Sequence, residues 1–371
     1  MKVKLGDLIE EYSERNIDNK YKPVAVGKYG IRARESIYSK ELAKDYSKNK
    51  LIYKGTLTIG MGSNQIDIGI LRDDEIYSVS PAYHTYNIKI SNYDYLDYLL
   101  TANNNRMFSI YANRGSRQGK TLDLKRWLTD ELRLHDEKDQ KIIVQTLNAV
   151  KQLISQKEAE LVKLDNLIKA RFVEMFGDID LAPQNKEWTK ISDIGEVVSG
   201  STPKTSIKEY WNGNICWITP AELSNMSGII YDSKKKITER GKSSCSLRMM
   251  PSRTVILSSR APIGKVALLG KEMCCNQGFK NIICNEKVAP EYLYYLLGYN
   301  TIFLNSLGRG ATFKEISKKI VGEIKVPLPA KELQNQFAVF TRQVDKSKFA
   351  VQKSLEKTQL LFDSLMQEYF G

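Results

Sequence analysis

The sequence has little of the side chains on which many enzyme active sites depend. It contains two histidines among 371 residues, His84 and His135, so a Ser-His-Asp triad is poorly supplied. Its five cysteines, at positions 216, 245, 274, 275 and 284, all lie in the second half and include no C-x-x-C pair. We therefore expect reduced, largely buried thiols and no metal site.

Long hydrophobic runs are also missing. No apolar run approaches the roughly 18 residues that a membrane-spanning helix needs. The first residues, MKVKLGDLIEEYSERN, have no hydrophobic core and carry acids early, which argues against a secretory signal. With 42% hydrophobic and 27% charged residues, the chain is typical of soluble globular proteins, and we expect it in the cytoplasm, without a membrane partner.

Catalytic and nucleotide-binding motifs are largely absent. There is no N-P-P-Y/F motif for flipping and methylating adenine, no G-x-G loop after a strand for a methyl donor, and no P-D…(D/E)-x-K nuclease pattern. Residues 115–121, GSRQGKT, resemble a Walker A loop but are one residue too short. A P-loop-like nucleotide hydrolase that uses Gly115 to Thr121 is the alternative function. A mobile loop that touches phosphates is the favoured interpretation of this segment.

Positive charge is abundant and clustered. The net charge is +13, with nine basic against two acidic residues in 231–265 and eight against three in 28–54. A solvated surface would account for either cluster alone. One cluster in each half of the chain favours a polyanionic partner, namely nucleic acid.

Two long helices are predicted from a sequence repeat. Residues 136–177 and 330–371 superimpose at a constant offset of 194, so that Val150 meets Val344 and both segments end in Phe-Gly. Each segment has a stripe of apolar side chains, its apolar seam, that must be buried against another surface. The simplest arrangement is that the two copies pack against each other. Two unrelated amphipathic helices would leave the shared register unexplained. The predicted interface residues are Leu147, Ile154, Leu161, Ile168, Val344, Val351, Leu355 and Phe362.

The segments that precede the helices are also related. Residues 4–8 parallel 190–194, and 95–100 (YLDYLL) parallel 292–297 (YLYYLL). We therefore predict an α+β fold with a pseudo-twofold internal repeat: two globular mixed α/β domains separated by two long antiparallel helices that form a coiled coil. The predicted boundaries are 1–135 for the first domain, 136–180 for the central helix and linker, 181–329 for the second domain and 330–371 for the C-terminal helix.

The second half resembles the specificity subunit of type I restriction–modification systems, and the duplicated layout extends that resemblance over the chain. The segments that carry it are 198–204 (VSGSTPK), 210–218 (YWNGNICWI), 255–265 (VILSSRAPIGK), 276–278 (NQG), 324–329 (IKVPLP), Gln334 with Gln336, and the closing Phe-Gly. In the first half, residues 77–86 (YSVSPAYHTY) look like the segment that replaces NQG in one subgroup. The first half departs from the GxTP and SSRAPIG patterns.

The resemblance implies a non-catalytic subunit that recognises double-stranded DNA. Each globular part would be a target-recognition domain for one half of a bipartite, asymmetric site. The helices would set the spacer and dock two adenine-methyltransferase (modification) subunits, which a restriction/translocase subunit can join. No cofactor is expected on this chain; S-adenosylmethionine, ATP and Mg belong to the partners. A coiled-coil scaffold that binds only protein is a further alternative.

Candidate DNA contacts follow from side-chain chemistry. Arg and Lys match guanine, Asn and Gln match adenine, and hydroxyl groups suit phosphates. In the first half the candidates are Lys54, Thr58, Arg72, Tyr83, His84, Arg114, Arg117 and Lys120. In the second half they are Thr202, Lys204, Ser258, Ser259, Arg260, Lys265, Asn276, Gln277, Lys280 and Arg309.

Overall fold

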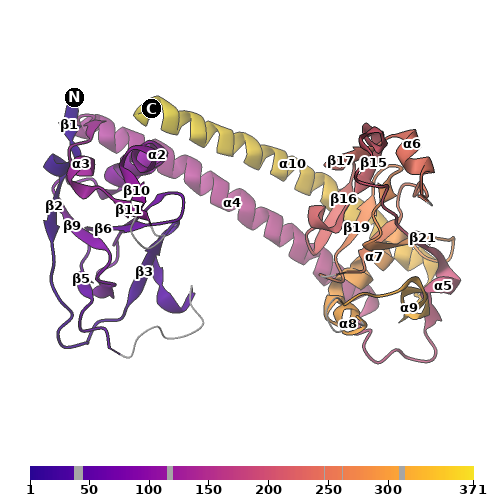
Figure 1. Ribbon diagram of the computed structural model, residues 1–371. Coiled ribbons are helices and arrows are strands. Elements are labelled where there is room, and N and C mark those ends of the chain that lie inside the picture. Colours follow the sequence, from indigo (N-terminus) through magenta and orange to yellow (C-terminus); the bar gives the residue numbers. More distant parts are fainter. Residues whose placement is uncertain (37–44, 115–119, 246, 261, 309–313) are drawn as a thin grey trace. The chain divides into compact units, whose positions relative to one another are not determined.

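The structure is a computed structural model that describes residues 1–36, 45–114, 120–245, 247–260, 262–308 and 314–371 (Figure 1). The chain divides into two compact units. Unit 1 comprises Met1–Ala159 with Gln352–Gly371, and unit 2 comprises Glu160–Val351. Both long helices contribute to both units. The predicted domain boundaries at 135, 180 and 329 stay a prediction.

Unit 1 is built on a four-stranded antiparallel sheet. Its order is β2 (Ile9–Tyr12), β9 (His84–Ile88), β6 (Thr56–Met61) and β7 (Ile66–Ile70). Four two-stranded pairs accompany it: β1 (Lys2–Lys4) with β12 (Glu131–Arg133), β3 (Val24–Gly27) with β4 (Gly30–Ala33), β5 (Lys50–Ile52) with β8 (Tyr77–Val79), and β10 (Ala112–Arg114) with β11 (Lys120–Leu122). The short helices are α1 (Leu5–Leu8), η1 (Arg34–Ser36) and α3 (Leu124–Leu128).

Helix α2 (Tyr93–Tyr111) covers one face of this sheet. Asn92 caps it by accepting a hydrogen bond from the Tyr95 amide at 3.1 Å. The repeated segment at residues 95–100 marks only the first part of this helix, and the polar run after residue 100 hides the continuation. Asn104 in this run exchanges two hydrogen bonds with the backbone of Ile66, at 3.0 and 2.8 Å, which fixes the polar turn of the helix to β7.

Unit 2 is built on a five-stranded sheet. Its order is β14 (Gly195–Ser199), β21 (Phe279–Cys284), β18 (Val255–Ser258), β19 (Val266–Leu269) and β16 (Met226–Ile230), with the β19–β16 pair parallel and the others antiparallel. The remaining strands are β17 (Lys235–Ile237), β15 (Trp211–Ile218) and β20 (Cys274–Cys275), which form one sheet, and β13 (Thr189–Lys190) with β22 (Lys325–Val326). The shorter helices are α5 (Ile191–Ile194), η2 (Lys208–Tyr210), η3 (Pro220–Glu222), α6 (Glu239–Ser243), α7 (Pro290–Tyr299), α8 (Thr301–Ser306) and α9 (Lys318–Glu323).

The two units share a framework. In each, a one-turn helix leads into the first strand of the sheet, and the order β2–β9–β6–β7 matches β14–β21–β18–β19. The Lys89 amide donates to the Leu8 carbonyl at 2.8 Å, and the Asn285 amide donates to the Ile194 carbonyl at 3.0 Å. These equivalent bonds follow β9 and β21. The predicted internal repeat is confirmed.

The long helices are α4 (Glu137–Phe176) and α10 (Lys331–Phe370). Within unit 2, Phe172 packs against Phe337 with ring centroids 5.5 Å apart, and Lys348 Nζ lies 2.5 Å from Asp165 Oδ1. The later residue of α4 meets the earlier residue of α10, so the helices are antiparallel there. The predicted fold class, α+β with a pair of long helices, is confirmed.

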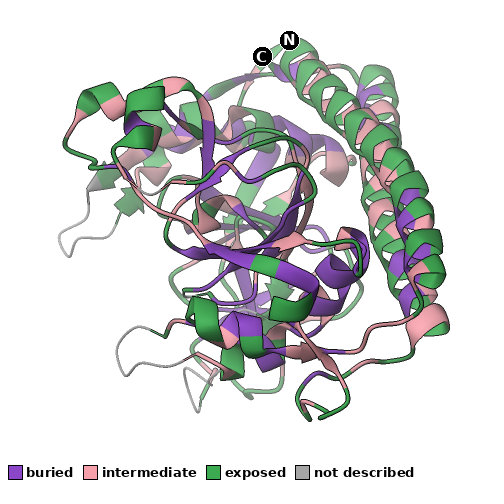
Figure 2. Cartoon of the chain, turned by 90° about the vertical axis from the view of Figure 1, so that its right-hand side faces the viewer, coloured by how far each residue is buried: buried purple, intermediate pink, exposed green. Residues whose placement is uncertain are grey.

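The predicted seam positions point to the covered side of each helix. Leu147, Ile168 and Val344 are buried, and Ile154, Leu161, Val351, Leu355 and Phe362 are half-buried. Figure 2 shows the strands mostly in the colour of buried residues and the long helices mostly in that of exposed residues. Two packed helices bury the apolar side chains between them only in part, because no third helix packs against the same side chains. The partial exposure of these positions agrees with a pair of helices. The individual interface assignments stay a prediction.

All five cysteine thiols are free. Burial raises the pKa of Cys284 to about 12, and it also raises the pKa of Cys275. Thiols that stay protonated are poor nucleophiles and metal ligands. Among the described residues, no helix is long and apolar enough to span a membrane.

Candidate nucleic-acid interface

Three sequence motifs of unit 2 meet at one end of its five-stranded sheet. Ser199, the last residue of β14, is paired with Lys280 at the start of β21. Ser258, the last residue of β18, is paired with Phe279 on the other side of β21. The described residues of the loops that continue from here, 200–204, 259–260 with 262–265, and 276–278, therefore lie side by side.

Short backbone hydrogen bonds hold these loops together. The Ser201 amide donates to the Cys275 carbonyl at 3.0 Å, and the Ser259 amide donates to the Gly278 carbonyl at 2.7 Å. A Cβ atom at Gly200 would lie 1.9 Å from the Asn276 carbonyl oxygen. Only glycine allows this approach, which explains the glycine of the VSGSTPK motif.

Lys280 lies at the centre of the junction, with 8% of its side chain exposed. Its ammonium group lies 3.4 Å from Ser259 Oγ, 3.5 Å from the Gln277 carbonyl oxygen and 3.3 Å from Glu315 Oε1. A buried cation needs such oxygen partners. Lys280 therefore links loops 259–265 and 276–278 to the segment that contains Glu315.

The other predicted contacts of unit 2 divide by exposure. Lys204, Arg260 and Gln277 are exposed, and Thr202 and Asn276 are half-buried.

Three more predicted residues of unit 2 face inward. Lys265 donates to the Leu223 carbonyl at 2.5 Å, and Ser258 and Ser259 are fully buried, which argues against direct DNA contacts by these side chains. Arg309 lies outside the described residues.

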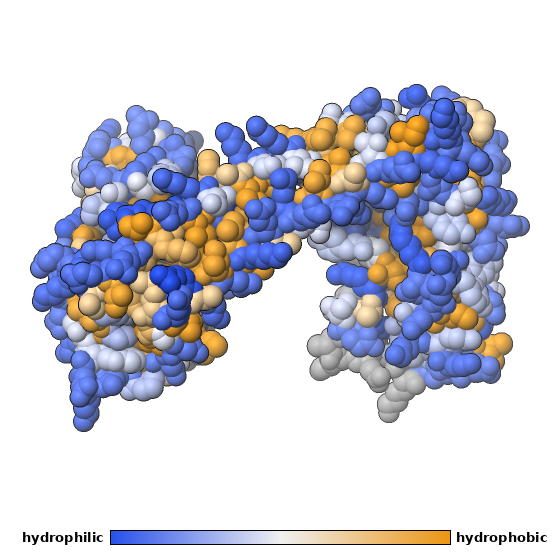
Figure 3. Space-filling model, turned by 180° about the vertical axis from the view of Figure 1, so that it is seen from behind, coloured by the Kyte–Doolittle hydropathy of each residue, from blue (hydrophilic) through white to orange (hydrophobic). Residues whose placement is uncertain are grey.

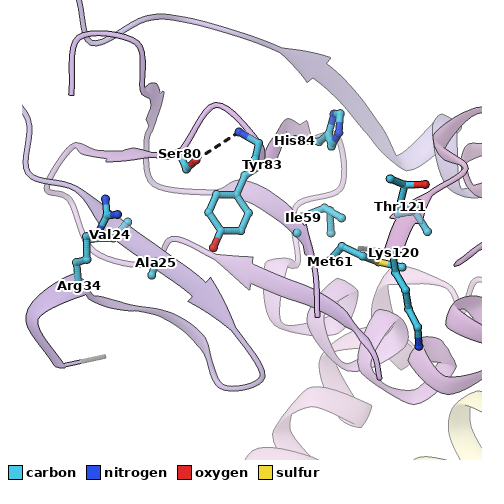
Figure 4. Close-up of a pocket in the computed structure, with 13 residues that line it drawn as sticks. Val24, Ala25, Arg34, Ile59, Met61, Ser80, Tyr83, His84, Lys120 and Thr121 are labelled. Atoms are coloured by element: carbon cyan, nitrogen blue, oxygen red, sulfur yellow. Dashed lines mark hydrogen bonds between the residues drawn. The ribbon is translucent and has the colours of Figure 1, made fainter. Parts of the chain in front are cut away.

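The corresponding end of the unit 1 sheet contains a cavity of about 490 Å³ (Figure 4). It is lined by Val24, Ala25, Arg34, Ile59, Gly60, Met61, Ser80, Ala82, Tyr83, His84, Lys120, Thr121 and Leu122. The structure thus brings together three predicted DNA contacts, Tyr83, His84 and Lys120, from segments that are separate in the sequence.

Tyr83 forms part of the cavity wall and is firmly held. Its hydroxyl donates to the Val26 carbonyl at 3.1 Å, and its amide donates to the Ser80 carbonyl at 3.0 Å. Its ring lies against Gly60, where an added Cβ would lie 2.4 Å from a ring carbon. The cavity therefore has a rigid aromatic surface.

His84 and Lys280 occupy equivalent positions in the two units. His84 lies five residues before Lys89, and Lys280 lies five residues before Asn285. His84 is paired with β6 in unit 1, and Lys280 is paired with β18, the equivalent strand of unit 2. His84 Nδ1 lies 3.3 Å from Glu11 Oε1, as Lys280 lies beside a glutamate in unit 2. Both units therefore place a nitrogen-containing side chain beside a carboxylate at the same end of the sheet.

The remaining predicted residues of unit 1 are engaged elsewhere. Lys54 Nζ lies 2.8 Å from Asp74 Oδ1, and Arg72 bonds Asp94 at 2.9 Å and Asp97 at 2.7 Å. Thr58 is fully buried, which argues against a direct DNA contact. The side chains of Arg114 and Arg117 lie outside the described residues.

The geometry does not support the P-loop alternative. Lys120 and Thr121 belong to β11, which pairs antiparallel with β10. A Walker A lysine and threonine instead open a helix after a strand. Residues 115–119 lie outside the described residues.

Residues 183–360 match the family described as "Type I restriction modification DNA specificity domain". The match spans slightly less than half of the chain. The resemblance of the chain to type I specificity subunits is confirmed. The match covers the interface motifs of unit 2 and most of α10.

Curated specificity subunits are similar over the same part of the chain. The specificity subunit of the type I restriction enzyme MjaIX from Methanocaldococcus jannaschii is 44% identical over 177 residues, which are 46% of this chain and 41% of that protein. The EcoR124I/EcoR124II specificity subunit from Escherichia coli is 28% identical over 150 residues, 38% of this chain and 37% of that protein. The chain thus matches less than half of the length of these relatives.

Solved specificity-subunit structures share the fold. The S subunit of a type I restriction–modification system from M. genitalium has a TM-score of 0.60 at 14% identity, covering 100% of this chain and 96% of that one. A chain from a structural study of assembly and conformational transition in the type I R-M system has a TM-score of 0.56 at 17% identity, covering 99% of this chain and 96% of that one.

Proposed function

We propose that the chain is the DNA sequence-recognition subunit of a type I restriction–modification complex. The observation that carries this proposal is the meeting of three specificity-family motifs at one end of the unit 2 sheet. Exposed Lys204, Arg260 and Gln277 at this end have the donors that base edges and phosphates accept. The chain itself catalyses no reaction and carries no cofactor.

The target is a bipartite, asymmetric DNA site. Each unit has a framework of the same topology, and the side chains at equivalent positions of the two sheets differ, as His84 and Lys280 do. Equivalent frameworks with different side chains suit two different half-sites. The 40 residues of α4 give a helix of about 60 Å, against about 34 Å for one turn of DNA, so helix length sets the spacer.

The long helices dock two adenine-methyltransferase subunits. Large apolar side chains are exposed on them: Phe349 at 71%, Leu360 at 69% and Val162 at 59%. Figure 3 shows hydrophobic surface among the hydrophilic residues of the molecule. Exposed apolar groups of this size favour a protein partner. S-adenosylmethionine, ATP and Mg belong to these partners and to a restriction subunit that joins them.

Methylation mapping tests the proposal. The chain is co-expressed with its methyltransferase subunits, and methylated adenines are mapped in random-sequence DNA. We expect one motif of two unequal parts separated by a fixed gap. A contiguous motif, or a motif that does not depend on this chain, would refute the proposal.

DNA binding by the assembled complex separates this function from that of a coiled-coil scaffold. A DNA-recognition subunit makes the affinity fall steeply with salt concentration, since phosphate contacts release counterions. A scaffold that binds only protein would not change the affinity of its partners for DNA.

A further inference from the structure

Glu315 connects two basic residues of the unit 2 interface. Its Oε2 accepts a hydrogen bond from Arg260 Nε at 3.0 Å, and its Oε1 lies 3.3 Å from Lys280 Nζ. One carboxylate therefore holds both an exposed guanidinium and a buried ammonium group. Sequence reasoning missed Glu315, because an acid in a basic region gives no sign of a DNA-binding role.

The backbone around Glu315 is fixed as well. Residues Arg260 and Glu315 form an antiparallel bridge, and the Ile316 amide donates to the Ser259 carbonyl at 3.0 Å. Ile316 is fully buried in the core of unit 2. The position of Glu315 is therefore fixed by the backbone and by the buried neighbour Ile316, in addition to its own ion pairs.

This arrangement orients Arg260. Its side chain is 51% exposed, while Nε is occupied by Glu315. Within the part of the chain that the structure describes, Nη1 and Nη2 have no hydrogen-bond partner. The end of the guanidinium, which has two parallel donors, is therefore available to a ligand with two adjacent acceptors.

We propose that Glu315 is a positioning residue that holds Arg260 for recognition of a guanine in the half-site of unit 2. This inference rests on the proposed function. Guanine offers two adjacent acceptors, O6 and N7, in the major groove, and they match the paired donors of arginine. A phosphate also accepts two donors, but it is present at every nucleotide and would confer no sequence preference.

The physical role of Glu315 is to reduce the freedom of a long side chain. An unrestrained arginine loses considerable rotamer entropy when it is held in one geometry. Here part of that entropy is already lost in the folded protein, and the carboxylate also polarises the guanidinium. Discrimination at the guanine therefore depends on Glu315, although Glu315 does not touch the base.

The test uses Arg260→Lys and Glu315→Gln in the assembled methyltransferase complex. Arg260→Lys keeps the charge and loses the paired donors. Glu315→Gln keeps the shape and loses the charge. Methylation of a library with every base at every position of the target is compared with that of the wild type, and thermal unfolding is measured in parallel.

Both variants should relax the preference at the same single G·C base pair. We expect a roughly 10- to 100-fold loss of discrimination for Arg260→Lys and a smaller loss for Glu315→Gln, with the other half-site unchanged. Glu196→Gln is the matched control, since Glu196 forms an exposed ion pair with Arg248 at 2.6 Å in the same unit. It should leave every base preference unchanged.

Four results would overturn the inference: a uniform change at all positions, a relaxed position that is not G·C, unchanged preferences in Arg260→Lys, or unchanged preferences in a folded Glu315→Gln. If Glu315→Gln fails to fold, Glu315→Asp, which keeps the charge and shortens the side chain, should relax the same base pair, and an unchanged preference in that variant would overturn the inference. Failure of the proposed function is a different outcome, since the wild-type complex would then show no bipartite motif at all.

Discussion

Phe172 and Phe337 belong to different long helices, and their rings meet edge to face, with planes at 75° and centroids 5.5 Å apart. Phe176 and Tyr292 complete the cluster, at 5.1 and 5.8 Å from Phe172. The cluster joins α4, α10 and α7. It thereby ties the helix pair to the core of unit 2.

Phe172→Ala should destabilise unit 2 by about 3–5 kcal/mol, because it removes a buried ring and leaves a cavity. Chemical unfolding followed by tryptophan fluorescence measures this change. The control is Phe349→Ala on the exposed face of α10, which should change the free energy of unfolding by less than about 0.5 kcal/mol. Equal effects of the two substitutions would contradict the described packing.

His135 should make unit 1 sensitive to acid. Burial, together with the nearby Arg133, lowers the pKa of His135 below its usual value of 6.5. Its Nδ1 lies 2.8 Å from the Tyr95 hydroxyl, which suits a neutral imidazole that accepts a hydrogen bond. Below about pH 6.5 His135 binds a proton in the unfolded chain but not yet in the folded chain. The free energy of unfolding therefore decreases as the pH decreases from about 6.5 to the folded pKa.

Thermal unfolding between pH 5 and 7.5 measures this dependence. In His135→Gln the loss of stability below pH 6.5 should be smaller than in the wild type. An unchanged slope would show that other groups account for the acid sensitivity.

Asp345 should lower the stability of unit 2 at neutral pH. Burial, and then the nearby Asp165 and Glu291, raise the pKa of Asp345, while Lys348 opposes them. A carboxyl with a raised folded pKa binds its proton more readily in the folded chain. Folding is therefore favoured as pH falls through the folded pKa, and the ionised group disfavours folding at pH 7.

Asp345→Asn should therefore raise the melting temperature at pH 7, and the difference from the wild type should shrink as the pH falls below the folded pKa. The matched control is Asp363→Asn, an exposed aspartate on the same helix. A lower melting temperature for Asp345→Asn at pH 7 would contradict this prediction.

The two units should determine different half-sites. His84→Ala in unit 1 should alter the base preferences in one half of the target. Gln277→Ala in unit 2 should alter those in the other half. The double variant should show the sum of both changes, since the two residues belong to different units. Methylation mapping checks this, and changes by both variants in one half-site would contradict it.

The exposed apolar side chains of the helices should bind the methyltransferase subunits. Phe349→Glu should weaken co-purification of these subunits at least tenfold, because a charge replaces a buried ring at the interface. Glu356→Gln on the same helix should have no such effect. Loss of DNA specificity with intact assembly would argue against this surface.

Much of the fold could be predicted from the sequence, because long-range repetition leaves a clear signal. The predicted helix over 136–177 corresponds to Glu137–Phe176, since no proline or glycine interrupts its apolar seam. The end of α2 was harder to predict. Its polar turn is stabilised by Asn104 bonds to a strand 38 residues away, which no local pattern reveals.

The candidate site was only partly predictable. The motifs of unit 2 indicated the loops, but not which side chains face outward. Lys265 and Arg260 belong to the same loop and the same chemical class, and only the fold turns one toward the Leu223 carbonyl and leaves the other exposed. Glu315 is 55 residues from Arg260 in sequence, so their ion pair was beyond any spacing argument.

The contact of Gly200 with the Asn276 backbone limits how new specificities can be engineered. Because residues 200–204 and 276–280 are fitted to each other at atomic distance, exchanging one segment without the other would place mismatched backbones in the same space. Retargeting the proposed half-site of unit 2 would therefore require both segments to be transplanted together, as one cassette from a single donor.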